Sequence, residues 1–164
     1  MTETVSIVIG SESDLDLANK CADALDSLSI SNSIQVLSAH RTPGLLETHV
    51  RECESGGTKV FVAMAGLAAH LAGAVASKTV LPVIGVPGDG GPLSGMDALL
   101  STVQMPKGIP VATVAIGSAG ATNAAYLAAQ ILGVESEEVR NSLLKVREDG
   151  VEAIKESNKK LSDS

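Results

Sequence analysis

One short polar segment of this sequence places a histidine directly before an arginine. His40 and Arg41 stand in the segment SAHRTP, residues 38–43, which follows an apolar run of strand length. Histidine titrates near neutral pH, and arginine is a permanent cation that can bind an anion through two parallel hydrogen bonds. The pair indicates a site that binds an anion and moves a proton. The alternative is a surface loop in which both side chains are merely solvated.

A second candidate segment reads GSESD over residues 10–14 and comes directly after the first apolar run. Its glycine permits a tight turn, and the hydroxyls of Ser11 and Ser13, with the N–H groups of a helix start, can hold one phosphate. The carboxylate of Asp14 would repel a phosphate, so its functional interpretation is an acceptor for a ribose hydroxyl. Ordinary capping of the following helix by Ser13 or Asp14 explains the same residues.

The third segment, AGLAAH over residues 65–70, is built from small side chains around one histidine. Small residues allow a flat ligand to lie against backbone amides at the start of the next helix. The candidate contact residues are Gly66, Ala68, Ala69 and His70. A structural, partly buried His70 is an equal alternative. His49, inside a helical pattern, is expected on the surface.

Two glycine-rich segments further along the chain are candidates for contacts rather than chemistry. Residues 87–95 read PGDGGPLSG, which suits a mobile lid or a contact between subunits. Residues 117–123 read GSAGATN and are expected to form a loop before an alanine-rich helix, whose small face would pack tightly in an oligomer. The sequence holds no GxSxG elbow, no Walker loop and no cluster with metal-ligand spacing.

Five apolar runs of strand length must position these segments, and one segment follows each run. The runs are continuous rather than alternating, which is typical of strands covered on both faces. They are Val5–Ile9, Ile34–Leu37, Val60–Ala65, Pro82–Val86 and Val111–Ile116. Helical patterns follow at 15–28, 43–54, 68–77, 95–104 and 121–132.

This alternation predicts an α/β protein: a three-layer, flavodoxin-like, doubly wound parallel sheet with helices on both faces. Ligands of such sheets bind at the carboxyl ends of the strands, where the polar segments would meet. A single domain is expected over residues 1–164, with its core at about 4–135. Residues 135–161 show a charged pattern with an apolar stripe, which predicts an amphipathic helix packed on its own domain or on a neighbouring subunit.

The composition argues against several classes of partner. The 164 residues carry a net charge of -7, and the 12 Lys and Arg residues are scattered, which argues against nucleic acid and anionic membranes. One Phe, one Tyr and no Trp leave no set of aromatic platforms for base stacking. Any phosphate bound by this protein should therefore belong to a small molecule.

Cysteines and apolar stretches predict the cellular location. Cys21 and Cys53 show neither CxxC nor metal-type spacing, which favours reduced thiols in a cytoplasmic protein. Residues 1–3 are polar and acidic, so no signal peptide is expected. The apolar stretches 60–77 and 108–134 are interrupted by His, Gly, Pro, Ser or Asn, which argues against membrane spans.

Taken in order, these segments resemble the 5-(carboxyamino)imidazole ribonucleotide mutase family of purine biosynthesis over about residues 4–135. The resemblance rests on six motifs that follow one another along the chain. They are GSESD at 10–14, SAHRTP at 38–43, AGLAAHLAG at 65–73, LPVIGVP at 81–87, LSGMDALLSTVQMPKGIPVATVAIG at 93–117 and NAAYLAAQIL at 123–132.

The resemblance implies a homo-octamer of flavodoxin-like subunits, without metal or organic cofactor, that acts on a small ribonucleotide. The implied reaction is an isomerisation that moves a carboxylate from the exocyclic amine of the imidazole to ring carbon C4. His40 matches the family's catalytic histidine, Arg41 a phosphate-side contact, and the segment from Gly66 to His70 the one that holds the imidazole and the carboxylate. The candidate substrate-binding residues are Ser11, Ser13, Asp14, Ser38, Arg41, Gly66, Ala68, Ala69 and His70.

Two residues depart from the usual pattern of the family: Leu67 stands where a second glycine is common, and Ala72 where proline is usual. A related branch carboxylates aminoimidazole ribonucleotide directly with carbon dioxide, and it has Lys in place of Arg41 and Ser-Asn in the third segment. Arg41 and residues 68–70 therefore favour the mutase. Direct carboxylation and a non-catalytic nucleotide-binding oligomeric module of the same fold remain the alternatives.

Overall fold

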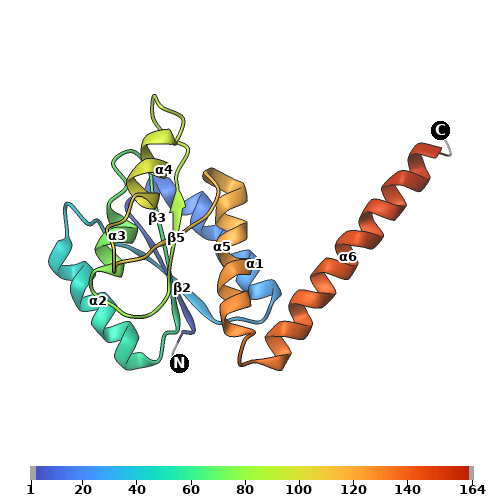
Figure 1. The fold of residues 1–164 in the computed structure, drawn as a ribbon, viewed down its shortest axis with the longest axis horizontal. Coiled ribbons are helices and arrows are strands. Elements are labelled where there is room, and N and C mark those ends of the chain that lie inside the picture. The colour runs from blue at the N-terminus through green and yellow to red at the C-terminus, as the bar shows by residue number, and fades with distance from the viewer. Residues whose placement is uncertain (1–2, 163–164) are drawn as a thin grey trace.

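The five predicted strands form one parallel sheet in the computed structural model, which describes residues 3–162 (Figure 1). The strand order is β2-β1-β3-β4-β5, so the chain order reverses between β1 and β3. The strands span Val5–Ile9 (β1), Asn32–Val36 (β2), Val60–Ala65 (β3), Val83–Pro87 (β4) and Ala112–Thr113 (β5). Residues 1–2, on which the expected lack of a signal peptide partly rests, and residues 163–164 of the expected domain lie outside the described residues.

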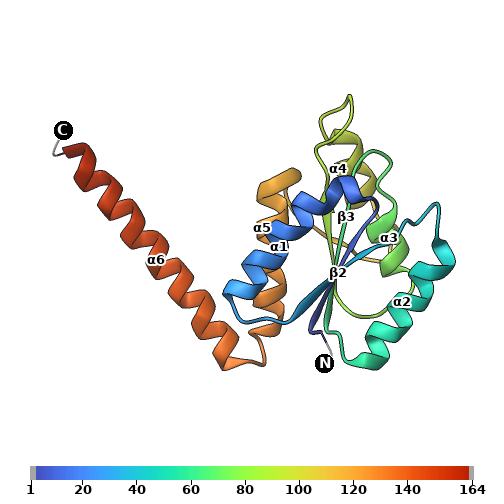
Figure 2. The ribbon, with the colours of Figure 1, turned by 180° about the vertical axis from the view of Figure 1, so that it is seen from behind.

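Helices cover both faces of this sheet (Figures 1 and 2), which confirms the predicted flavodoxin-like, three-layer fold. One face carries α1 (Leu15–Ser27) and α5 (Gly117–Leu132), which pack on each other. The other face carries α2 (Pro43–Gly56), α3 (Leu71–Ala76) and α4 (Met96–Val103). A short 3-10 turn, Glu12–Asp14, leads into α1, and the helix α6 spans Glu137–Ser162.

The central strands are buried on both faces, as their continuous apolar runs predict. Every residue of β1 and β4 is buried, and so is all of β3 except Ala65. Full burial of a branched aliphatic side chain contributes about 1.5–3 kcal/mol to stability. The loops that follow β1, β3 and β4 are therefore anchored on strands that are buried in the core.

The alanine-rich helix α5 belongs to the interior of the subunit, which corrects one expectation. Five of its alanines are fully buried against α1 and the sheet: Ala121, Ala124, Ala125, Ala128 and Ala129. Small side chains let α5 approach these neighbours closely. The small face of α5 therefore serves the subunit's own core and is not available as a contact between subunits.

The two edge strands differ from the predicted runs because each has a neighbour on one side only. In β2, Gln35 and Val36 are exposed, so the expected cover on both faces is wrong there. Of the predicted run 111–116, only Ala112 and Thr113 form a strand, paired with β4. An apolar run alone does not show how many neighbours a strand will have.

Two helices begin three or more residues away from the predicted start. The helix α3 begins at Leu71 instead of Ala68, because Leu67 adopts a left-handed φ of 55° and residues 68–70 form a turn. The helix α5 begins at Gly117, so the expected 117–123 loop is helical. Gly120 packs directly on the carbonyl of Ala115, where a side chain would collide.

Only the first part of α6 packs on the domain. Val139, Leu143 and Val146 contact the core, whereas Val151 and Ile154 are 54% and 64% exposed. Beyond this contact the helix extends away from the sheet and its covering helices (Figures 1 and 2). Neither α6 nor any other helix within residues 3–162 is long and apolar enough to cross a membrane.

Candidate active site

A cavity of about 790 Å³ lies at the carboxyl ends of β1 to β4, around the point where the chain order reverses. Doubly wound folds bind ligands at this point, and the volume is typical of small-molecule sites. The candidate residues that line it are Ser11, Ser13, Asp14, Ser38, His40, Arg41, Gly66, Ala68 and His70. The remaining candidate, Ala69, is buried beneath the loop with 2% of its surface exposed.

The first loop, residues 10–14 after β1, is held by hydrogen bonds to Ser11. Its Oγ accepts a hydrogen bond from the Ser13 N–H at 3.4 Å, and its carbonyl accepts one from the Asp14 N–H at 3.0 Å. Ser11 therefore caps the 3-10 turn, and the expected capping of α1 by the side chain of Ser13 or Asp14 is wrong. Burial raises the pKa of the half-buried Asp14 carboxyl, more than a hydrogen bond with the Ser11 backbone lowers it.

Arg41 joins the second loop, residues 38–43 after β2, to the first loop. Its Nη2 donates to the carbonyl oxygen of Gly10 at 2.8 Å. The loop itself is held by Ser38, whose Oγ accepts from the Arg41 N–H at 3.1 Å, and by Thr42, whose Oγ1 accepts from the Ser38 N–H at 2.9 Å. A guanidinium has five N–H donors, so the bond to Gly10 orients Arg41 and leaves donors for an anion beside Ser11.

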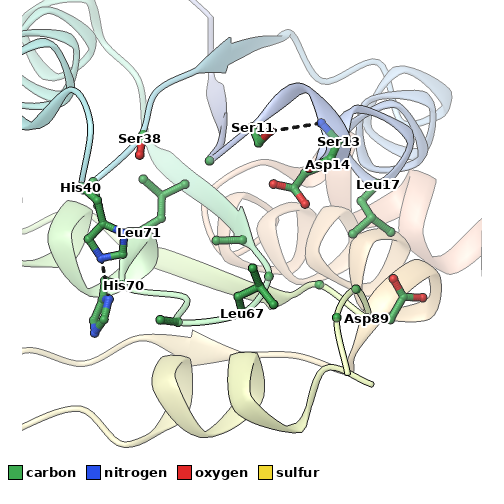
Figure 3. A pocket seen from close by; sticks show the side chains of 18 of the residues that line it. Ser11, Ser13, Asp14, Leu17, Ser38, His40, Leu67, His70, Leu71 and Asp89 are labelled. Atoms are coloured by element: carbon green, nitrogen blue, oxygen red, sulfur yellow. Dashed lines mark hydrogen bonds between the residues drawn. The ribbon is translucent and has the colours of Figure 1, made fainter. Parts of the chain in front are cut away.

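The two histidines of the candidate set contact each other at the cavity wall (Figure 3). Nε2 of His40 lies 2.7 Å from Nδ1 of His70, and the ring centroids are 4.8 Å apart with the ring planes at 74°. One of these two nitrogens must carry the shared hydrogen, so the pair holds a proton between two bases. Because Arg41 follows His40 directly, a proton-transfer group stands beside the candidate anion site.

The third loop, residues 65–70 at the end of β3, meets the fourth loop, residues 87–95 at the end of β4, at two glycines. The Gly88 N–H donates to the Ala65 carbonyl at 2.9 Å, and a side chain at Gly88 would come within 3.2 Å of the Gly66 backbone. Gly91, with a φ of 86°, lies against the side chain of Leu67. The glycine-rich segment therefore forms part of the cavity wall through residues 88–91.

Sequence reasoning missed part of the wall that comes from α1 and α5. Leu17 and Lys20 line the cavity, and Nζ of Lys20 donates to Oγ of Ser118 at 2.7 Å. The signal for the α1 residues is their spacing, because Leu17 and Lys20 follow Asp14 at intervals of three and share one helix face. No comparable sequence signal marks Ser118, since its contribution depends on how α5 packs against α1.

His49 is not the surface residue that its helical pattern predicts. Its Nε2 lies 2.9 Å from Oγ of the buried Ser6 and 3.4 Å from Sγ of Cys53. Burial lowers the pKa of His49, while the charges of Glu52 and Glu3 act in the opposite direction. This cluster of Ser6, His49 and Cys53 lies outside the residues that line the cavity.

Both cysteines are free thiols, and Cys21 is buried, which raises its pKa to about 12. Over residues 3–162, no group of three or more His, Cys, Asp or Glu side chains is arranged to hold a metal ion. The ionisable side chains that line the cavity are Asp14, Asp16, Lys20, His40, Arg41, His70 and Asp89.

Known proteins resemble this chain in both sequence and fold. Residues 4–153 match the family described as AIR carboxylase, and this match covers most of the chain, including all loops of the cavity. The chain belongs to this family. Three of the six motifs, at 10–14, 38–43 and 65–73, supply residues that line the cavity.

Individual members of the family match over nearly the whole chain. The N5-carboxyaminoimidazole ribonucleotide mutase of Pseudomonas aeruginosa is 49% identical over 154 residues, which cover 94% of each chain. The protein of the same name from Bacillus subtilis is 47% identical over 161 residues, which cover 98% of this chain and 99% of the relative. Among solved structures, PurE of Treponema denticola matches with a TM-score of 0.87 and 31% identity, over 96% of this chain and 97% of that one.

Proposed function

We propose that this chain is an enzyme of purine biosynthesis, a mutase that converts N5-carboxyaminoimidazole ribonucleotide into carboxyaminoimidazole ribonucleotide. The observation that carries the proposal is the contact of His40 with His70 in a cavity that Arg41 also lines. This reaction requires both proton transfer and the binding of an anionic substrate. Relatives 47% and 49% identical to the chain bear the name of this enzyme.

The substrate's phosphate binds among Arg41, Ser11, Ser13 and Ser38, which supply a cation and three hydroxyls to the cavity wall. Charge-assisted hydrogen bonds from a guanidinium are about twice as strong as neutral ones, so Arg41 contributes most of this binding. Asp14 accepts a hydrogen bond from a ribose hydroxyl. The imidazole and its carboxylate lie against the backbone of residues 66–70, next to His70.

The reaction has two halves that need a proton in opposite directions. In the first half, the bond between the exocyclic nitrogen and the carboxylate carbon breaks, carbon dioxide leaves, and the nitrogen takes up a proton. In the second half, ring carbon C4 attacks the carbon dioxide as an enamine carbon, and the proton on C4 leaves. One group that first donates and then accepts a proton balances both halves. An imidazole performs both steps near neutral pH.

His40 is that group in our proposal, and His70 is a positioning residue. The 2.7 Å contact with His70 Nδ1 fixes the orientation of the His40 ring, so that its other nitrogen, Nδ1, exchanges the proton with the substrate. The cavity also removes water from the carboxylate on the exocyclic nitrogen, which favours release of carbon dioxide. The residues of the second and third loops therefore act together on one substrate.

Two other functions fit the observations less well. Direct carboxylation of aminoimidazole ribonucleotide is disfavoured because the chain keeps Arg41 and the Ala-Ala-His sequence at 68–70, and because its relatives bear the mutase name. A nucleotide-binding module without catalysis needs Ser11 and Arg41. It does not need two histidines in contact beside them.

Product formation from each candidate substrate tests the proposal. We expect efficient conversion of N5-carboxyaminoimidazole ribonucleotide at low bicarbonate, and carboxylation of the parent aminoimidazole ribonucleotide only at high bicarbonate. Good activity on the parent nucleotide at modest bicarbonate would identify a direct carboxylase. Nucleotide binding without turnover of either substrate would identify a binding module.

The proposal includes a cytoplasmic homo-octamer of single-domain subunits, residues 1–164, that works without metal or organic cofactor. The support for the octamer is the apolar surface that a single subunit exposes. Met96, Leu100 and Val103 form a row along α4 and are 52%, 52% and 45% exposed, and the far half of α6 carries exposed Val151 and Ile154. Surface of this kind is typical of interfaces in symmetric oligomers. Light scattering at micromolar concentration should give one species of eight subunits, and a monomer would contradict the assembly.

A further inference from the structure

The helix α6 carries an apolar stripe that the rest of the subunit leaves exposed. Leu144, Val151 and Ile154 are 52%, 54% and 64% exposed, and Arg147 between them is exposed as well. The last apolar side chain of α6 that packs on the core is Val146. Beyond it the helix extends away from the domain (Figures 1 and 2). Monomeric proteins rarely expose a contiguous apolar surface of this kind, so we looked for the surface that would cover it.

The spacing of the stripe is that of a coiled coil. From Leu144 onward its positions follow at alternating intervals of three and four residues, which is a repeat of 3.5 residues. The stripe, here called the α6 seam, consists of Leu144, Arg147, Val151, Ile154, Asn158 and Leu161. Asn158 falls on heptad position a, where a single Asn specifies the register of paired helices. The spacing therefore favours a second helix as the occupant of the seam.

Charge distinguishes the two orientations in which α6 of a second copy can lie on the seam. In a parallel pair, Arg147 would face Arg147 of the second copy at a core position, where like charges repel. In an antiparallel pair centred between Val151 and Ile154, Arg147 faces Asn158 of the second copy. The side-chain carbonyl oxygen of Asn158 accepts hydrogen bonds from a guanidinium. The seam therefore fits an antiparallel pair.

Residues beside the seam fit the same orientation. Glu148 and Lys155 lie on one flank, at heptad position e, and the antiparallel pair places each against the other residue of the second copy. Within one subunit, Nζ of Lys155 lies 2.7 Å from Oε1 of Glu152, with the two side chains 65% and 66% exposed. An ion pair this exposed contributes little, so Lys155 is able to turn toward Glu148 of the second copy. Gly150, on the other flank, is surrounded by open space that admits a second helix.

A groove at the base of α6 fits the end of the second helix. It has a volume of about 440 Å³ and includes Leu144, with Arg140 and Arg147. In the antiparallel pair the last turn of the second α6 lies beside Leu144. The carbonyl end of a helix carries a partial negative charge, which the two arginines of the groove complement. The lysines of that last turn occupy heptad positions b and c, away from the seam.

We infer that α6 is an interaction surface for a second copy of this chain, and that the two helices pair antiparallel as a short coiled coil over residues 144–161. The inference goes beyond the proposed octamer, because it assigns the surface and the orientation of one contact. A twofold contact of this kind fits a dimer as well as a larger closed assembly. It does not rest on the proposed reaction, since the seam lies outside the active-site cavity.

Disulfide trapping tests the orientation. Arg147→Cys and Asn158→Cys are introduced together and singly into a Cys53→Ser background, in which the remaining Cys21 is buried. Positions 147 and 158 of one helix are about 16 Å apart, too far for a disulfide within the chain. After mild oxidation we expect a covalent dimer on a denaturing gel from the double variant and none from either single variant. A dimer from each single variant would show a parallel pair, and no dimer from any variant would show that α6 docks elsewhere. Both results would overturn the inference.

Light scattering during dilution tests whether the seam holds copies together. Ile154→Asp places a charge in the seam and should shift dissociation of the assembly to concentrations at least about tenfold higher. Ala153→Asp is the matched control: it adds the same charge on the same exposed turn but off the seam, and should dissociate like the wild type. Equal behaviour of the two variants, or a wild type that is monomeric at micromolar concentration, would refute the pairing. If the wild type assembles and the double variant is trapped but no nucleotide is converted, the proposed reaction alone fails and the inference stands.

Discussion

The molecule contains two histidine clusters on the same sheet, and they differ in access and in partners. His40 and His70 are exposed at the wall of a cavity and contact each other. His49 is half-buried outside that cavity, between Ser6 of β1 and Cys53 of α2. The exposed pair can exchange a proton with a ligand, whereas burial disfavours the charged form of His49. Access to a cavity, and not the residue type, thus separates the histidine that we propose as catalytic from the structural one.

Removing one imidazole from each cluster should give the largest difference between the two. His40→Asn should reduce turnover by about 10²-fold or more and leave substrate binding nearly intact, because proton transfer is lost while a polar side chain remains. His49→Gln is the matched control and should keep wild-type turnover, since His49 lies outside the cavity. Steady-state kinetics and calorimetric binding of the nucleotide give both numbers. Near-normal turnover of His40→Asn would move the acid and base role to His70 or to water.

The second prediction compares two arginines, one inside the cavity and one outside. Arg41→Ala should weaken nucleotide binding by ~2–4 kcal/mol, because a charge-assisted contact to the phosphate is lost. Arg51→Ala is the control: Arg51 is exposed on α2, paired with Glu47, and absent from the cavity wall. Titration calorimetry of both variants measures the difference. Equal affinities for Arg41→Ala and the wild type would place the phosphate elsewhere.

The smallest expected effect concerns the buried cluster and the dependence of stability on pH. Since burial lowers the pKa of His49 below its usual 6.5, the unfolded chain takes up a proton on His49 more readily than the folded chain. The contribution of His49 to stability is thus complete above pH 6.5 and is lost as the pH falls from there through the lowered pKa. His49→Gln should flatten this part of the curve. Urea unfolding midpoints measured from pH 7.5 to 5 check the prediction, and an unchanged slope in the variant would contradict it.

Much of the fold was predictable from the sequence, because the central strands carry their own signal. Val5–Ile9 and Val60–Ala65 were predicted residue for residue, since strands with neighbours on both sides and helices on both faces are almost entirely apolar. The edge strand at 112–113 was predicted too long because its length depends on pairing with β4, which is a tertiary property. The loops after the strands, and so most of the cavity wall, followed from the strand positions.

What the sequence did not reveal are contacts between distant segments. The contact of His40 with His70 joins residues 30 positions apart. The left-handed backbone at Leu67, in the loop that carries His70, was not predicted either. His49 was predicted wrongly because helical periodicity does not show that Ser6, a polar residue inside an apolar strand, faces it. The contact of Lys20 with Ser118 was missed because the two residues are 98 positions apart.

The central claim is that the carboxylate moves within one bound nucleotide instead of arriving from solution. A single forward turnover tests it most directly, with enzyme in excess over unlabelled N5-carboxyaminoimidazole ribonucleotide in a buffer that contains labelled bicarbonate. The account predicts that carboxyaminoimidazole ribonucleotide forms with little label, because the carbon dioxide released in the first half is recaptured before it exchanges. Rapid entry of label into the product, together with good activity on the parent aminoimidazole ribonucleotide at modest bicarbonate, would contradict the account and identify a direct carboxylase.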